Sequence, residues 1–221
     1  IAAACAAADV ALLGGETAEH PGVMAPDAFD LAGAALGVVE RGDEITGATI
    51  DRGDVVIGLD SPNLRANGFS LVRRALAGRL ELDDELPGTG RPAAEVLLEP
   101  SVLYAPAVAA LISAVPVRGL AHVTGGGLPG NLARILPPNR VAVLDTSAWS
   151  PAPVFAAIGE LTGAEDAELF RTFNMGIGFV AVVAAEHVDA ALAALGSAGR
   201  AARAIGSVVA GEGSVRLVSA G

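Results

Sequence analysis

The stretch VVIGLDSPNLRANGFSLVRRALAG, Val55 to Gly78, decides the fold class because it joins a strand pattern directly to a helix pattern. The opening VVIGLD is almost wholly apolar, as in a strand covered on both faces of a sheet. Further along, Phe69, Val72 and Leu76 recur at the three- and four-residue spacing of one helix face. We therefore expect a strand over 55–60 and a helix within 67–78.

The same alternation of strand and helix patterns continues to the end of the chain. Glycine, proline and polar clusters separate the apolar runs. This order predicts an α/β fold of the α+β type, with mixed sheets and flanking helices. Strands are expected within 116–127, 140–145, 177–184, 201–211 and 214–218, and helices at 129–137, 153–163, 188–195 and on either side of Pro100.

The N-terminal part predicts a separate set of elements before a candidate domain boundary. Residues 2–8 predict the end of a helix, 10–15 a strand that enters a glycine turn, and 29–40 a second strand. The polar, turn-rich stretch 42–54 is the best candidate for a domain boundary. The chain does not begin with methionine and starts in mid-pattern, so we expect the beginning of its first domain to be missing.

The charge balance excludes several partners. The chain has 14 basic and 25 acidic residues, and all the basic ones are arginine. A net charge of −11 argues against nucleic acid, which needs clustered cations. The apolar runs are too short to span a membrane, and the opening has no basic region typical of a signal peptide. A single cysteine fits a reducing cytoplasm.

The segment GGETAEHPG places two glycines directly before two carboxylates. Gly14 and Gly15 give the backbone freedom to approach a ligand. Glu16 and Glu19 offer the carboxylate oxygens that Mg²⁺ takes together with substrate phosphates. The competing interpretation is a tight turn whose acids are merely solvated.

The segment AHVTGGG runs from a strand into consecutive glycines and then a helix. Backbone N–H groups in such a loop form an anion-binding nest, to which Thr124 adds a hydroxyl. The alternative is a flexible connection. His122 is a candidate proton-transfer group, or else a packed histidine that is hydrogen-bonded.

Two further segments place polar residues beside glycine. In SPNLRANG, Arg65 is a good bidentate donor to phosphate or carboxylate, and Asn67 is either a functional residue or the N-cap of the next helix. In RTFNMGIGFV, Asn174 and two glycines precede a strand, which alone indicates only a hairpin or bulge.

Taken together and in this order, GGETAEHPG, NGFSLVRR, AHVTGGGLPGNLARILP and RTFNMGIGFVAVV resemble the motifs of the aminoimidazole ribonucleotide (AIR) synthetases, or phosphoribosylformylglycinamidine cyclo-ligases. The resemblance covers essentially the whole chain. It implies a PurM-like architecture, with 1–44 as the C-terminal part of an ATP-binding, dimer-forming domain and 45–221 as the C-terminal α/β domain. Related ATP-dependent enzymes, among them thiamine-phosphate kinase and a hydrogenase-maturation protein, share that fold.

The resemblance also implies an activity. The family closes the imidazole ring of formylglycinamidine ribonucleotide with ATP and Mg²⁺, and works as a cytoplasmic homodimer in purine biosynthesis. The implied cofactor-binding residues are Gly14, Gly15, Glu16, Thr17 and Glu19, with Glu16 preferred as the metal-linked acid. The implied substrate-phosphate residues are Thr124, Gly125, Gly126, Gly127 and Asn174, and the implied catalytic residues are His122, Arg65 and Asn67.

Two departures from the family pattern matter. Arg65 stands where typical members carry a histidine, and arginine keeps a donor but cannot shuttle a proton near neutral pH. The family's N-terminal glycine/lysine loop and its metal-binding acids lie outside these 221 residues. Another ATP-dependent enzyme of the same fold, such as a small-molecule kinase, and a non-catalytic homologue therefore stay open as alternatives.

Overall fold

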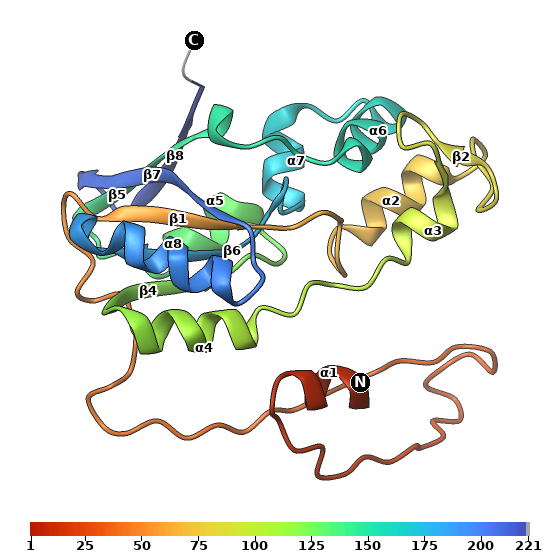
Figure 1. The fold of residues 1–221 in the computed structure, drawn as a ribbon. Coiled ribbons are helices and arrows are strands. Elements are labelled where there is room, and N and C mark those ends of the chain that lie inside the picture. The colour runs from red at the N-terminus through yellow and green to blue at the C-terminus, as the bar shows by residue number, and fades with distance from the viewer. Residues whose placement is uncertain (220–221) are drawn as a thin grey trace. The chain divides into compact units, whose positions relative to one another are not determined.

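The computed structural model describes residues 1–219, and these divide into two compact units. The first unit is Ile1–Glu44, and the second begins at Ile45. Figure 1 labels the elements of both.

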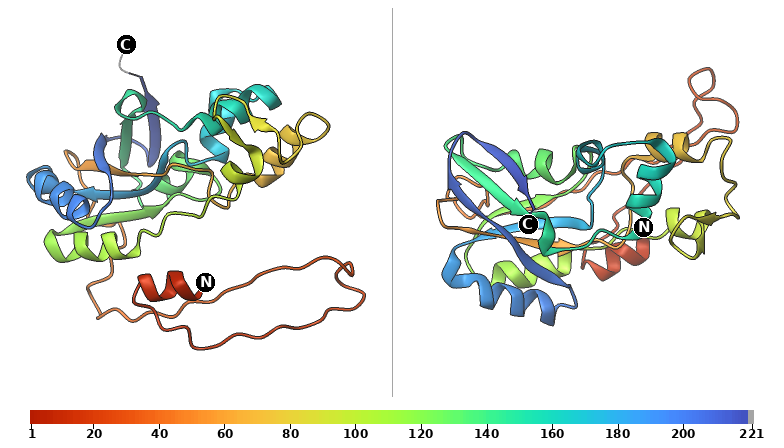
Figure 2. Two further views of the ribbon diagram at one scale, coloured as in Figure 1. Left: turned by 45° about the vertical axis from the view of Figure 1, so that its right-hand side comes forward. Right: turned by 90° about the horizontal axis from the view of Figure 1, so that it is seen from above.

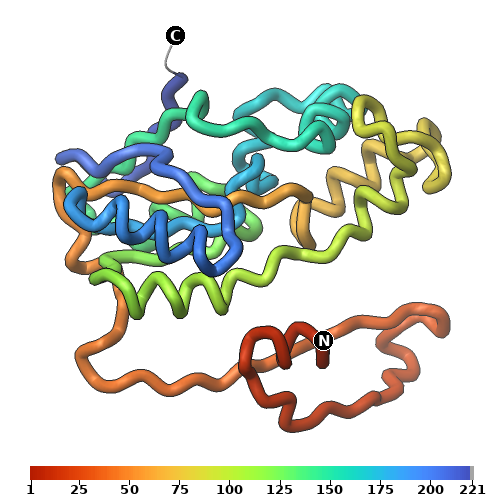
Figure 3. Tube along the Cα trace, viewed as in Figure 1, coloured from red at the N-terminus to blue at the C-terminus, as the bar shows by residue number. Residues whose placement is uncertain are grey.

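The first unit has little regular structure. It holds one helix, α1 (Ala2–Ala7), and Figure 3 shows the rest as irregular chain. The strands predicted at 10–15 and 29–40 are wrong, because residues 1–44 as described form no ladder and only one isolated bridge, between Pro21 and Met24. A strand needs a neighbour for its N–H and C=O groups. Without one, the apolar residues of these segments stay exposed, Leu36 by 96%.

The second unit is built on a six-stranded mixed sheet in the order β4-β6-β1-β7-β5-β8. All neighbouring strands are antiparallel except β5 and β8, which are parallel. The predicted mixed sheet is therefore confirmed. The strands are β1 (Val55–Asp60), β4 (Val117–His122), β5 (Arg140–Asp145), β6 (Ile177–Val183), β7 (Ala202–Ala210) and β8 (Ser214–Val218).

Helices cover both faces of this sheet. Helices α4 (Ala105–Ala114) and α8 (Val188–Ser197) lie side by side on one face, and α5 (Gly127–Ala133) lies on the other (Figures 1 and 2). Neighbouring residues of β1 point into different cores, since Val56 packs with the α5 side and Ile57 with the α4/α8 side. Both are fully buried, which is why VVIGLD lacks the polar alternation of a half-exposed strand.

A helical lobe with its own core packs beyond one end of the sheet (Figure 1). Its centre holds Phe155 and Phe173, whose ring centroids are 6.0 Å apart. The lobe contains α2 (Phe69–Leu76), α3 (Ala93–Leu97), α6 (Pro153–Thr162) and α7 (Asp166–Thr172), with the hairpin of β2 (Glu85–Leu86) and β3 (Arg91–Pro92). Short 3₁₀ turns lie at Thr146–Ala148 and Ala185–His187.

The sequence patterns missed α7 and the β2–β3 hairpin, and they misplaced one helix. The helix predicted at 129–137 begins earlier, at Gly127, and ends at Ala133. The last of the three glycines is therefore the first helical residue. Within the described residues no helix has the length and apolar character to cross a membrane.

A buried carboxylate ties the start of β1 across β6 to β4. Asp54 is 2% exposed, and one of its oxygens accepts from the Arg118 guanidinium at 2.6 Å. Its other oxygen accepts from the backbone N–H of Asp51 at 2.8 Å. The pair thus fixes where the first strand of the sheet begins.

Replacing Asp54 with alanine is expected to lower the free energy of unfolding by about 1–3 kcal/mol, because two donors lose a buried acceptor. Urea denaturation monitored by circular dichroism measures this. Asp51→Asn is the matched control, since Asp51 also pairs with an arginine but its side chain is 59% exposed. Equal losses in the two variants would contradict the structural role of Asp54.

Candidate functional site

The loop that leaves β1 and the segment that enters β6 are held together by hydrogen bonds. The Ser61 N–H donates to the Gly176 carbonyl at 2.8 Å. The Asn174 amide donates to the Asn63 carbonyl at 2.9 Å, and its oxygen accepts from the Gly176 N–H at 2.8 Å. Two of the four sequence motifs, 61–68 and 171–178, thus meet at one end of the sheet.

Asn63 shapes the turn that presents Arg65. Its side-chain oxygen accepts from the Arg65 N–H at 3.1 Å, and its amide donates to the Pro100 carbonyl at 3.0 Å. Arg65 has a φ of 60°, in the left-handed region that L-residues seldom adopt. The local bond from Asn63 supports this backbone conformation.

The Arg65 side chain is buried, with 9% of the residue exposed. One guanidinium nitrogen, Nη1, donates to the carbonyls of Val123 at 3.1 Å and Gly178 at 3.0 Å. The other, Nη2, contacts Nε2 of His122. Burial lowers the pKa of Arg65, yet arginine remains a cation at neutral pH. Arg65 therefore brings β4, β6 and the loop after β1 to one point.

His122 lines a cavity of about 320 Å³ together with Arg65, Tyr104 and Phe179. The rings of Tyr104, His122 and Phe179 pack in tilted or edge-on pairs at centroid distances of 5.5–6.2 Å. The Arg65 guanidinium lies 5.4 Å from the Tyr104 ring centroid. Desolvation and, second, the Arg65 cation lower the pKa of His122. Burial raises the pKa of Tyr104, whose hydroxyl donates to the Asp60 carbonyl at 2.8 Å.

The glycine loop folds around the side chain of Asn131, which is 5% exposed. The Asn131 amide nitrogen lies within 3.3 Å of the carbonyls of Thr124 and Gly125 and 2.7 Å from that of Gly127. With those carbonyls drawn inward, the N–H groups of Gly125 and Gly126 have no acceptor among residues 1–219. Such unpaired N–H groups are what an anion-binding nest requires.

Gly127 cannot carry a side chain. Its φ is 65°, and an added Cβ would lie 1.8 Å from the Phe170 carbonyl oxygen. On the open side of the loop, the exposed Arg134 places a guanidinium nitrogen 3.8 Å from the Cβ position of Gly126 and donates to Asn131 at 3.2 Å. The third glycine therefore serves packing, and a cation stands beside the second.

The N-cap interpretation of Asn67 is wrong. The N-cap of α2 is Gly68, with a φ of 75°, and no side chain caps that helix. An added Cβ on Gly68 would lie 2.2 Å from the Phe173 ring, so only glycine fits between this turn and the lobe. Asn67 is half-buried and its side chain has no hydrogen-bond partner within residues 1–219.

The predicted cofactor-binding residues all lie exposed in the first unit. Neither Gly14 nor Gly15 has a positive φ, and an added Cβ on either would meet nothing within 4 Å. Within residues 1–219, no three His, Cys, Asp or Glu side chains are grouped to hold a metal. Glu16 and Glu19 have the hard oxygens that suit Mg²⁺, which commonly takes one or two carboxylates and completes its shell with phosphates and water.

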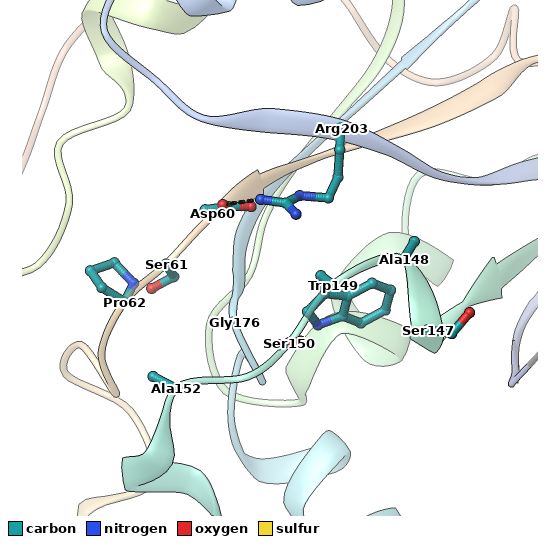
Figure 4. A pocket seen from close by; sticks show the side chains of 10 residues that line it. All are labelled: Asp60, Ser61, Pro62, Ser147, Ala148, Trp149, Ser150, Ala152, Gly176 and Arg203. Atoms are coloured by element: carbon teal, nitrogen blue, oxygen red, sulfur yellow. Dashed lines mark hydrogen bonds and ion pairs between the residues drawn. The ribbon is translucent and has the colours of Figure 1, made fainter. Parts of the chain in front are cut away.

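A second cavity, of about 380 Å³, lies at the same end of the sheet (Figure 4). Asp60 from the end of β1 and Arg203 from β7 form an ion pair on its wall. Trp149 lines it too and donates its indole N–H to the Met175 carbonyl at 2.7 Å. This cavity adjoins the loop at 61–63, but it contains none of the predicted site residues.

Sequence reasoning missed several residues that the fold brings to the site. Tyr104 carried no local signal, because it precedes an ordinary apolar helix. Asn131 and Arg134 stand inside the quoted segment LPGNLARILP, four and seven residues after Gly127, so helical spacing could have placed them beside the glycine loop.

Residues 51–218 match the family described as AIR synthase related protein, C-terminal domain, and the chain belongs to that family. Together with the curated relatives below, one of which matches 99% of this chain, this confirms the resemblance inferred from the four motifs.

Curated relatives carry a more particular name. The phosphoribosylformylglycinamidine cyclo-ligase of Myxococcus xanthus is 47% identical over 220 residues, which is 99% of this chain and 64% of that protein. The cyclo-ligase of Anaeromyxobacter sp. (strain Fw109-5) is 47% identical over 214 residues, 96% of this chain and 62% of that protein. The chain thus spans less than two thirds of the length of these relatives.

Solved structures confirm the fold class. A hydrogenase maturation protein HypE aligns with a TM-score of 0.56 at 20% identity, over 83% of this chain and 54% of that one. Thiamine-monophosphate kinase from Stenotrophomonas maltophilia aligns with a TM-score of 0.56 at 21% identity, over 81% and 54%. At these identities the likeness shows a shared fold.

Replacing Asn131 with aspartate is expected to destabilise the glycine loop and lower the unfolding free energy by about 1–3 kcal/mol, because a carboxylate would face three carbonyl oxygens. Denaturant unfolding checks the loss. Asn139→Asp is the control, since Asn139 is exposed and its side chain forms no hydrogen bond in the described structure. An Asn131 variant as stable as that control would show that the amide does not hold the loop.

Proposed function

We propose that this chain forms the larger, C-terminal part of an ATP-dependent cyclo-ligase that converts formylglycinamidine ribonucleotide to AIR. The observation that carries the proposal is the 47% identity over 99% of the chain to a curated cyclo-ligase. In this reaction ATP phosphorylates the formyl oxygen, a nitrogen of the substrate attacks the activated carbon, and phosphate leaves. The products are AIR, ADP and phosphate, and the proposed setting is purine biosynthesis in the cytoplasm.

The glycine loop is the proposed seat of the substrate's ribose phosphate. Its support is the pair of N–H groups at Gly125 and Gly126, which have no acceptor within residues 1–219, and the exposed cation of Arg134. The Thr124 hydroxyl lies beside the loop and donates to Oδ1 of Asn131 at 3.2 Å. Oriented N–H groups and a guanidinium are the donors that proteins use for phosphate. Gly127 contributes by letting the helix start directly behind the loop.

Asn174 receives a different role from the one that the motif suggested. It is 2% exposed and its amide bonds to backbone groups of the 61–63 and 174–176 segments. We assign it to positioning these segments, so that its effect on the substrate is indirect. Asn67, half-buried and without a partner in the described residues, is the better candidate for direct contact with substrate.

The first unit is the proposed ATP side of the enzyme. Gly14, Gly15 and Thr17 would contribute backbone and hydroxyl groups to the nucleotide, and Glu16, with Glu19 as second choice, would hold Mg²⁺ against its phosphates. A HypE of the same fold has been solved in complex with ATP, at 18% identity, which supports a nucleotide site on this fold generally. The exposed apolar residues of this unit are consistent with a homodimer through the complete N-terminal domain.

No enzyme nucleophile is needed for this chemistry. The metal would offset the triphosphate charge, and aligned donors would stabilise charge on the transferred phosphoryl group. The contribution of the chain is then mainly to hold the substrate nitrogen near the activated carbon.

The full-length natural protein is expected to release ADP only when formylglycinamidine ribonucleotide is present, and AIR should form in equal amount. A coupled ADP assay with chromatographic detection of AIR tests this. Thiamine monophosphate is the comparison substrate, because a kinase shares the fold. ADP release with that substrate and no ring closure would replace the cyclo-ligase proposal by a kinase.

In the same protein, Glu16→Gln is expected to lower Mg²⁺-dependent turnover about tenfold or more, because a metal-linked carboxylate supplies more than about 1.4 kcal/mol of barrier lowering. Raising the Mg²⁺ concentration should recover part of the loss. Glu40→Gln is the control, as an exposed acid of the same unit outside the motif. Unchanged turnover of the Glu16 variant would remove Glu16 from the metal site.

A further inference from the structure

The contact between Arg65 and His122 fixes more than the position of two side chains. We infer that Arg65 holds His122 as a neutral imidazole with Nε2 unprotonated and the proton on Nδ1, which makes His122 a hydrogen-bond donor to an oxygen of the substrate. In this protonation state His122 does not act as the base that takes up a proton, because its unprotonated nitrogen is occupied by Arg65.

The first step concerns donors and acceptors. Every nitrogen of a guanidinium carries hydrogen and none accepts, so the ring nitrogen that Arg65 touches must be the acceptor. That nitrogen is Nε2. A neutral imidazole whose Nε2 accepts carries its proton on Nδ1. Nδ1 has no hydrogen-bond partner within residues 1–219 and belongs to a side chain that lines the 320 Å³ cavity.

The second step is that hydrogen bonds to two backbone carbonyls hold the Arg65 guanidinium in place. Its Nη1 is shared between the carbonyls of Val123 and Gly178, and its backbone N–H is bound by Asn63. Its Nε is buried without a partner in the described structure. Protonating Nε2 would place two donors and two positive charges against each other.

The third step is the charge around the pair. Within the described residues, no carboxylate forms an ion pair with Arg65 or His122. The remaining titratable group that faces them is Tyr104, whose pKa is raised by burial, so it stays neutral. The charges of Arg200 and Asp60 affect the pKa of Tyr104 and not the pKa of His122. The Arg65 charge is therefore not cancelled locally, and it opposes an imidazolium.

The chemical consequence rests on the proposed function. A neutral Nδ1–H stabilises an oxygen on which negative charge develops, such as a formyl or phosphoryl oxygen, without changing its own protonation. The proton that the attacking nitrogen loses must then go to another base or to water.

The direct test is nitrogen-15 NMR of the histidine side chains in the full-length natural protein, without substrate. The long-range proton–nitrogen spectrum is expected to show Nε2 of His122 as an unprotonated ring nitrogen and Nδ1 as a protonated one at neutral pH. His20 and His187 serve as internal references. An Nε2–H tautomer, or an imidazolium at neutral pH, would overturn the inference. This measurement needs no variant and no activity.

Removing the charge supplies the causal test. In Arg65→Gln the titration of His122 should move to higher pH, because the like charge is gone. In Arg200→Gln, which removes a positive charge that acts on Tyr104 but does not contact His122, the titration should stay where it was. An unchanged titration in the Arg65 variant, with the fold confirmed by the same spectra, would show that Arg65 does not control the imidazole.

Activity of the full-length protein separates the donor role from a structural one. Asparagine at position 122 keeps an N–H near the place of Nδ1, whereas glutamine places its amide near Nε2. We expect kcat of His122→Asn to exceed that of His122→Gln by at least about threefold, the value of one neutral hydrogen bond. The reverse order would overturn the donor role. Failure of the wild-type protein to form AIR would instead reject the proposed function and leave the NMR result standing.

Discussion

The buried guanidinium of Arg65 is the interaction on which the rest of the site depends. A cation that is 9% exposed and has no carboxylate partner in the described chain is costly to bury, and only well-placed acceptors can offset that cost. Here the acceptors are the carbonyls of Val123 and Gly178 and a ring nitrogen of His122. The hydrogen bonds of one side chain thus join the ends of two strands to the loop after a third.

Most of the second unit could be predicted from the sequence because its signals are local. Strand and helix periods, with glycine and proline between them, sufficed for every long element of the sheet and for α4, α6 and α8. What could not be predicted depends on residues far apart along the chain. Arg65 and His122 are 57 positions apart and Asp60 and Arg203 are 143 apart, and no pattern within a window joins them. Helix α7 did have a signal, the acids Asp166 and Glu168 in its first turn.

In the first unit, sequence patterns predicted strands that the described structure does not contain. Its apolar runs have strand composition, yet a strand exists only when a neighbour completes its hydrogen bonds. Residues 1–44 contain no such neighbour in the described structure, and Leu13, Phe29 and Val38 are each more than 80% exposed. The composition of these segments therefore favoured strands that the described structure does not form. The prediction that GGETAE binds ATP rests on its resemblance to the family motif and not on the geometry of this unit.

The helical lobe adds a mechanical consequence. Two of the chain segments that join the lobe to the sheet are 61–68, between β1 and α2, and 173–176, between α7 and β6, and both belong to the site. They are cross-linked by Asn174 and by the Ser61–Gly176 bond. A tilt of the lobe against the sheet would therefore shift the backbone of Arg65 directly, through the segment 61–68 that carries it. The two cross-linked segments would act as the hinge between the lobe and the sheet.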